Sequence, residues 1–330
     1  MKSDHPKVNY GKTGILLVNL GTPDSTSWWD IRKYLKEFLS DKRVIEVNPI
    51  VWQIILNLFI LTFRPSKTAK AYKEIWMKDK NMSPLRYFTQ MQAKKLSDQI
   101  NEEKIIVDYA MRYGNPSIKS KIIELHKLGC ENLVVLPLYP QYAAATTATV
   151  CDEVYRTLMN MRWQPNLKIV PHYESEPLYI EAIKNSILKK VSEISWKPDL
   201  IMASYHGIPK KYFDKGDPYH CYCHKTTRLI SERYSEIEII TTFQSRFGPQ
   251  EWLQPYTDKT LENLPIDGKK NLLVICPGFS SDCVETLEEI SIQGKESFMK
   301  HGGKNFDTIP CLNDNDDHIA LIKHLVLENI

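Results

Sequence analysis

The sequence predicts an α/β fold, in which parallel strands alternate with helices, and two observations lead to this prediction. Short, continuously apolar runs recur along the 330 residues, as expected of strands that are buried on both faces. Helical stretches separate most of these runs, which indicates βαβ crossovers and a parallel sheet. Because domains usually hold roughly 100 to 200 residues, we expect a chain of this length to form two of them.

The predicted strands are defined by their apolar runs. The first covers residues 14–20 and is followed by Gly-Thr-Pro, which is typical of a turn. The others cover residues 105–111, 133–138, 167–170, 200–203, 237–243 and 272–276. Ligands of such folds bind at the carboxyl ends of the strands, so we expect functional residues there.

The predicted helices lie between these strands and after the last one. Ser83 and Pro84 are typical of a helix start, and apolar residues at helical spacing follow them. Another helix begins near Ile118 and stops at Gly129. The apolar spacing in residues 316–327 predicts a C-terminal helix that packs against the body.

No Gly/Ser-rich linker divides the chain, and we place the domain boundary within residues 173–177. The predicted N-terminal domain covers residues 1–174, and the predicted C-terminal domain covers residues 175–330.

The composition excludes several classes of protein. With 43 Lys and Arg against 40 Asp and Glu, the chain has no general surface for neutralising phosphates, so we expect no nucleic acid partner. Only 13 glycines occur, and no glycine-rich phosphate loop is present, so we expect no nucleotide. Seven cysteines without regular spacing, and an N-terminus without a secretory signal, predict a cytoplasmic protein.

The segment 50–63 (IVWQIILNLFILTF) departs from the pattern because it is apolar almost throughout. Its 14 residues are fewer than the roughly 20 that span a bilayer. A buried core helix would explain it. The alternative is a segment that dips into the headgroup region of a membrane, which the cations Arg64, Lys67 and Lys70 after it favour.

His206 follows the predicted strand 200–203, so it emerges at the carboxyl end of that strand. A neutral imidazole in this position accepts protons near neutral pH or binds a borderline metal ion. A hydrogen-bonded structural histidine is the simpler alternative.

Three carboxylates follow the predicted strand 272–276. Asp282, Glu285 and Glu289 are spaced by three and four residues, which places them on one face of a helix. Such like charges destabilise a solvated helix by roughly 0.2–0.5 kcal/mol per pair unless a cation or proton traffic compensates. The helix dipole favours Asp282 and Glu285 at the N-terminus without explaining Glu289, so we lean towards a functional role.

The string HCYCH contains Cys221, Cys223 and His224, which are candidate metal ligands. Zinc sites usually show a C-x₂₋₄-C pair and a second pair elsewhere, and no clear second pair appears. We therefore do not expect a metal site at this string, although the residue types leave it open.

Seven strings, read in order, resemble those of one enzyme family. They are NLGTP (19–23), MRYGNP (111–116), LYPQY (138–142), SYHGIP (204–209), GDPY (216–219), TFQSR (242–246) and PGFSSDCVETLEE (277–289). Together they resemble ferrochelatase, the terminal enzyme of haem synthesis, and in particular its Gram-negative bacterial branch. The resemblance runs from about residue 14 to the C-terminus.

The resemblance implies two similar Rossmann-like domains of the chelatase type, which enclose a porphyrin cleft and insert ferrous iron into protoporphyrin IX. Iron is then a substrate, and we expect no resident cofactor. Ala144 stands where some members carry a cluster cysteine, so no [2Fe–2S] cluster is expected. Leu20 stands where members that use coproporphyrin III commonly carry tyrosine, which favours protoporphyrin IX. The segment 50–63 matches the family's membrane-facing lip, which implies a cytoplasmic enzyme peripheral to the inner membrane.

The resemblance also implies roles for single residues. His206 matches the catalytic histidine at the porphyrin face, and Glu285 matches the catalytic glutamate. Asp282 and Glu289 match acidic neighbours, so all four residues are predicted to handle the metal or protons. The predicted substrate-binding residues are Leu20, Arg112, Tyr113, Tyr72, Ser83 and Tyr139, of which Arg112 and Tyr113 would contact propionates or the ring edge.

Metallation explains these residue types, because two pyrrole N–H protons must leave and Fe²⁺ must lose its water.

Two rival functions share the fold. A porphyrin carrier would need no proton acceptor, so the presence of His206 and Glu285 favours an enzyme. A chelatase that inserts cobalt or nickel into a more acidic tetrapyrrole would need more basic residues and no lipid-facing segment, which residues 50–63 argue against.

Overall fold

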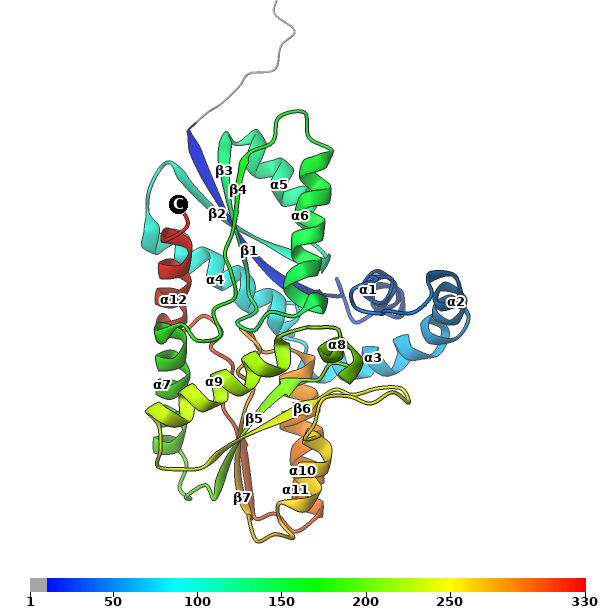
Figure 1. Cartoon of the computed structure of the whole chain (residues 1–330), viewed down its shortest axis with the longest axis vertical. Helices are drawn as coiled ribbons and strands as arrows, with labels where there is room; N and C mark the ends of the chain where they lie inside the picture. The colour runs from blue at the N-terminus through cyan, green and yellow to red at the C-terminus, as the bar shows by residue number, and fades with distance from the viewer. Residues whose placement is uncertain (1–10) are drawn as a thin grey trace, which may run out of the picture.

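The chain forms two parallel β-sheets with helices around them, as a computed structural model shows for residues 11–330 (Figure 1). The first sheet has the order β2-β1-β3-β4, and the second has the order β6-β5-β7-β8. The strands of the first sheet are β1 (Lys12–Thr22), β2 (Ile105–Gly114), β3 (Cys130–Pro137) and β4 (Asn166–Ile169). The strands of the second sheet are β5 (Leu200–His206), β6 (Ile239–Gln244), β7 (Asn271–Ile275) and β8 (Asn305–Thr308). The predicted α/β fold is confirmed.

The two sheets repeat the same strand order, since each places its second strand beside its first and its third and fourth on the other side. Seven of the strands match predicted apolar runs. The exception is β8, which the sequence did not predict because its four residues, NFDT, form a half-buried edge rather than an apolar run.

The helices cover the sheets and fill the space between them. Those of the first half are α1 (Trp28–Leu39), α2 (Pro49–Ile55), the π-helix η1 (Leu56–Ile60), α3 (Leu61–Ile75), α4 (Pro84–Ile100), α5 (Ile118–Lys127), the π-helix η2 (Ala144–Ala148) and α6 (Thr149–Met159). Those of the second half are α7 (Pro177–Glu193), α8 (Lys210–Asp214), α9 (Tyr219–Arg233), α10 (Thr257–Asn263), the π-helix η3 (Glu285–Gly294), α11 (Lys295–Lys300) and α12 (Asp316–Leu327). In Figure 1, α7 and α12 run along one side of both sheets, and α1 to α3 project from the other.

One apolar core joins the two halves. It contains Leu17 and Leu136 from the first sheet together with Ile201 and Tyr205 from the second. Residues 170–176, which contain the predicted domain boundary, link β4 to α7. The two sheets are therefore held in fixed relation by shared packing as well as by the chain.

The apolar segment belongs to a longer helix than the sequence suggested. Residues 49–75 run continuously through α2, η1 and α3, although Pro65 lies inside α3 and removes one backbone donor. Within residues 11–330 this is the one helix long and apolar enough to cross a membrane, and only 17% of its most apolar stretch is buried. That exposure excludes the alternative of a buried core helix.

The C-terminal helix α12 packs against α4 and α7, as predicted. Asn315 caps it by accepting a hydrogen bond from the backbone N–H of His318 at 2.8 Å. The ring of His318 is 1% exposed, and its Nδ1 lies 2.6 Å from the carbonyl oxygen of Asn313, to which it donates. Burial lowers the pKa of His318 from 6.5 to about 4.

The buried His318 predicts a loss of stability in mild acid. Its imidazole stays neutral in the folded protein down to about pH 4, whereas the unfolded chain takes up the proton below about pH 6.5. The free energy of unfolding should therefore fall by about 3 kcal/mol for this group as pH falls across that window.

Urea unfolding of the wild type and of His318→Asn at several pH values measures this effect. The variant keeps a donor for the Asn313 carbonyl but has no titrating group at this position. The difference in the free energy of unfolding between the wild type and the variant should therefore shrink from pH 7 to pH 4. A constant difference would show that His318 takes up its proton equally in both states.

Candidate active site

His206 is the last residue of β5, the central strand that pairs with both β6 and β7. Its Nδ1 lies 2.6 Å from the carbonyl oxygen of Gly207. Because a carbonyl only accepts, Nδ1 carries the proton, and Nε2 of the neutral ring has a lone pair for a substrate proton. Gly207 keeps this turn tight, since a Cβ there would lie 2.8 Å from the carbonyl oxygen of Gln244.

Glu285 and Glu289 lie on η3, which follows β7 and is a π-helix rather than the expected α-helix. Both oxygens of Glu289 are hydrogen-bonded by Ser245, from its backbone N–H at 2.7 Å and its hydroxyl at 2.5 Å. Burial raises the pKa of Glu289, while the hydrogen bonds from Ser245 and the charge of His206 lower it and the charge of Glu285 raises it further. The structure thus brings His206, Glu285 and Glu289 within electrostatic reach of one another.

Asp282 does not share the face of these two glutamates, because it lies in the turn before η3 and is buried. Its carboxylate accepts hydrogen bonds from the Asn313 amide at 2.7 Å, the Thr286 hydroxyl at 3.0 Å and the Cys311 backbone N–H at 3.3 Å. The spacing argument placed all three carboxylates on one helix, whereas the helix begins only at Glu285.

Four predicted residues line one cavity. They are Leu20, Tyr72, Ser83 and Glu285, and further lining comes from Tyr34 and several apolar side chains. Burial raises the pKa of Tyr72, and the charge of Glu285 adds to this rise, so the phenol is neutral. The cavity has a volume of about 10 Å³, close to the least that one water molecule needs.

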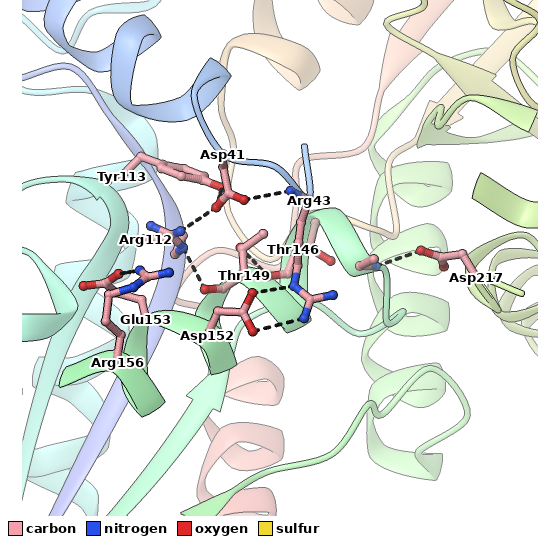
Figure 2. A network of polar contacts seen from close by, with 11 residues as sticks. Asp41, Arg43, Arg112, Tyr113, Thr146, Thr149, Asp152, Glu153, Arg156 and Asp217 are labelled. Atoms are coloured by element: carbon pink, nitrogen blue, oxygen red, sulfur yellow. Dashed lines mark hydrogen bonds and ion pairs between the residues drawn. The ribbon is translucent and has the colours of Figure 1, made fainter. Parts of the chain in front are cut away.

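Arg112 and Tyr113 lie in a polar network instead of this cavity (Figure 2). The Arg112 guanidinium donates to the Asp41 carboxylate at 2.5 Å and to the Thr149 carbonyl at 2.8 Å, and the Tyr113 hydroxyl donates to Asp41 at 2.9 Å. The side chains of Arg112 and Asp41 are 9% and 12% exposed. In this structure the Arg112 guanidinium is therefore oriented by Asp41 and Thr149, and the Tyr113 hydroxyl by Asp41.

The same network reaches towards α6 and the second half of the chain. Arg43 donates from its backbone to Asp41 at 2.9 Å and from its side chain to Asp152 on α6 at 2.5 and 3.1 Å (Figure 2). Tyr139 is half-buried nearby, where the charge of Arg112 acts on its phenol, and its buried hydroxyl has no hydrogen-bond partner among residues 11–330. Tyr139 is thus outside the cavity that holds Tyr72.

The Arg112–Asp41 pair predicts a large cost of truncation. Removing one partner of a buried ion pair leaves the other charge uncompensated, so Arg112→Met should lower the free energy of unfolding by about 3 kcal/mol. Arg228→Met is the control, because Arg228 and Glu232 form an exposed pair, and it should change stability by less than about 0.5 kcal/mol. Urea unfolding measures both; equal effects would show that the network contributes little.

Arg64 is a residue at the site that the sequence analysis considered only as a flank of the apolar segment. Its guanidinium lies 5.4 Å from the ring centroid of Phe247, which is on the loop after β6. Arg64 as a whole is exposed, yet partial desolvation by its neighbours lowers the pKa of its guanidinium, and the charge of Glu285 acts in the opposite direction. Within residues 11–330 Arg64 forms no ion pair, so it is a cation near Glu285 with unused donors.

No three His, Cys, Asp or Glu side chains among residues 11–330 are arranged to hold a metal ion. His206, Glu285, Asp282 and Glu289 therefore do not form a closed coordination sphere in this conformation. In the string HCYCH, Cys221 is exposed on α9 while Cys223 is buried beneath it. A metal role for any of these residues stays a prediction.

Solved structures with the same architecture include the sirohydrochlorin chelatase SirB from Bacillus subtilis. "SirB from Bacillus subtilis with Fe3+" superposes with a TM-score of 0.58 and 12% identity, covering 96% of this chain and 95% of that one. "The structure of CbiX, the terminal Enzyme for Biosynthesis of Siroheme in Denitrifying Bacteria" superposes with a TM-score of 0.53 and 11% identity, covering 96% of this chain and 99% of that one. The two-domain α/β fold is thus that of the chelatases.

Sequence comparison identifies the family within that class. A family model described as Ferrochelatase matches residues 12–330. The ferrochelatase of Allorhizobium ampelinum is 54% identical over 99% of this chain and 96% of its own length, and that of Rhizobium meliloti is 54% identical over 98% and 96%. The chain belongs to the ferrochelatase family. It is an enzyme of the lyase class that inserts iron into a porphyrin in haem synthesis.

Proposed function

We propose that the porphyrin is protoporphyrin IX, that His206 accepts the pyrrole protons, and that Glu285 and Glu289 relay iron or protons. The observation that carries this proposal is the protonated Nδ1 of His206, which leaves Nε2 as the acceptor beside the two carboxylates. In the reaction two N–H bonds of the porphyrin break, Fe²⁺ takes the nitrogen lone pairs, and two protons leave without a change of oxidation state.

The chemistry divides between the imidazole and the carboxylates. A neutral imidazole accepts a proton near neutral pH, which suits removal of protons from the macrocycle. Carboxylates bind a hydrated divalent ion and release it readily, which suits Glu285 and Glu289 as a relay. Asp282 accepts three hydrogen bonds inside the protein, so we assign it the task of fixing the turn before Glu285 rather than that of a relay.

The lining of the cavity supports the choice of protoporphyrin IX. Leu20, Ile75 and Leu85 contribute apolar surface, which suits a macrocycle whose edges carry vinyl and methyl groups with few carboxylates. Arg64 supplies a cation near this cavity for a propionate. Arg112 is paired with Asp41 and does not line the cavity. The proposal includes no resident cofactor and no [2Fe–2S] cluster, since iron enters as substrate.

The visible spectrum of the porphyrin tests the catalytic proposal. Under anaerobic conditions the wild type should convert the bands of protoporphyrin IX into those of the metalloporphyrin after Fe²⁺ is added. His206→Ala should lower the rate by about 100-fold or more, because general base catalysis typically contributes 10²–10⁴-fold. Full turnover by this variant would remove His206 from the mechanism, and binding without turnover by the wild type would favour a carrier.

We also propose that the enzyme lies on the cytoplasmic face of the inner membrane through residues 50–63. Ile50, Ile54, Leu58, Phe59 and Phe63 are exposed on the projecting helix α2–η1–α3, a large apolar surface for a protein in water. The cations of α3 follow this surface, as expected of a helix that lies in the headgroup region.

Vesicle binding tests the membrane proposal with a matched pair of isoleucines. Ile50 is 76% exposed on the helix, and Ile266 is 73% exposed on the second half of the chain. Ile50→Ser should weaken cosedimentation with phospholipid vesicles by about tenfold, because burying such a side chain contributes about 1.5–3 kcal/mol. Ile266→Ser should leave binding unchanged; equal losses, or no binding by the wild type, would contradict the proposal.

A further inference from the structure

Ser245 has a backbone conformation that few residues with a side chain adopt. Its φ is +65°, in the left-handed region, and it comes directly after β6. Such a conformation is strained for a residue with a Cβ, and it persists where the surrounding structure holds it, commonly at functional sites. Ser245 belongs to the string TFQSR, to which the sequence analysis assigned no role.

This conformation directs both donors of Ser245 at one carboxylate. The backbone N–H lies 2.7 Å from Oε1 of Glu289, and the hydroxyl lies 2.5 Å from Oε2. One residue therefore fixes both oxygens, which sets the plane of the carboxylate as well as its position. A lysine or arginine partner would neutralise the negative charge of Glu289. The hydroxyl of Ser245 is neutral, so it leaves that charge available to a cation.

A chain of buried hydrogen bonds connects the Ser245–Glu289 pair to the strand that carries His206. The Ser204 hydroxyl donates to Oε1 of Gln244 at 2.7 Å, and Nε2 of Gln244 donates to the backbone carbonyl of Glu285 at 2.9 Å and to Glu289 at 3.3 Å. Ser204 lies two residues before His206, and His206 pairs with Gln244 across the sheet. The strand register therefore places Gln244 opposite His206, and Ser245 with its two hydrogen bonds to Glu289 follows at the next residue.

We propose that Ser245 is a positioning residue for metallation, which holds the carboxylate of Glu289 in a fixed orientation beside His206. This inference rests on the proposed role of Glu289. Holding the carboxylate in advance removes the entropy cost of ordering it at each turnover, so loss of the hydroxyl should lower kcat more than it changes the KM for porphyrin.

Two substitutions separate the hydroxyl from the backbone strain. Ser245→Ala loses the hydroxyl and keeps the Cβ, whereas Ser245→Gly loses the hydroxyl and relaxes the backbone, since glycine adopts positive φ readily. Both should lower kcat by about tenfold, with the KM for protoporphyrin IX changed by less than about twofold. Ser245→Gly should unfold at a temperature no lower than Ser245→Ala. A merely structural role predicts that Ser245→Gly keeps wild-type kcat, and that result would overturn the inference.

A double-mutant cycle with Glu289→Gln shows whether Ser245 acts through Glu289. The glutamine variant keeps the size of the side chain and removes its charge. In that background Ser245→Gly should change kcat by less than about twofold, whereas independent effects would multiply and would contradict the inference. The wild type is measured in the same assay: its failure to turn over would reject the proposed function, and wild-type turnover with unaffected Ser245 variants would reject only the positioning role.

Discussion

The shared packing between the two halves of the chain is the constraint on which the site depends. Leucines of the first sheet and tyrosines of the second belong to one apolar core, and buried hydrogen bonds cross the same boundary. Gln92 on α4 donates to the Ser280 carbonyl, the Ser281 hydroxyl and the Asn313 carbonyl, all in the second half. A buried amide of this kind is costly to leave unpaired, so the two halves are held at one separation. The cavity lined by Leu20 and Glu285 exists because residues far apart in the sequence meet at that separation.

Local pattern was enough to predict the fold and the ends of the strands where chemistry occurs. Apolar runs define strands because a strand buried on both faces has no polar side, and His206 follows such a run directly. Glu285 and Glu289 were joined with His206 by resemblance, and the structure explains their proximity because they follow β7, which pairs with β5. Leu20, Tyr72 and Ser83 were assigned to one cleft by resemblance, and they do line one cavity with Glu285.

The remaining details depend on partners that no local pattern reveals. Arg112 was expected at a propionate, but its environment is set by Asp41, which lies in a loop far from it in sequence. Asp282 was expected on a helix face, but Asn313 and Cys311, which follow β8 in the chain, donate hydrogen bonds to its carboxylate and hold it in the segment before η3. The apolar segment was bounded at residue 63 by its composition, whereas the helix continues through Pro65 and the polar residues that follow it to Ile75. The left-handed backbone of Ser245 leaves no mark in composition or spacing.

The small volume of the cavity has a kinetic consequence. A porphyrin is far larger than a space of about 10 Å³, so the proposed binding of porphyrin at this cavity requires a step in which the walls part and another in which they close. The wall that α1 to α3 form is the part of the structure that projects from the body, and the apolar segment within it buries few side chains. Opening this wall would expose the separate apolar cluster that α1 and α3 share with Tyr113, whereas moving the two sheets apart would expose their larger common core. For the proposed site, substrate exchange would then depend on the motion of this one projecting helical layer, while the shared core of the two sheets stays in place.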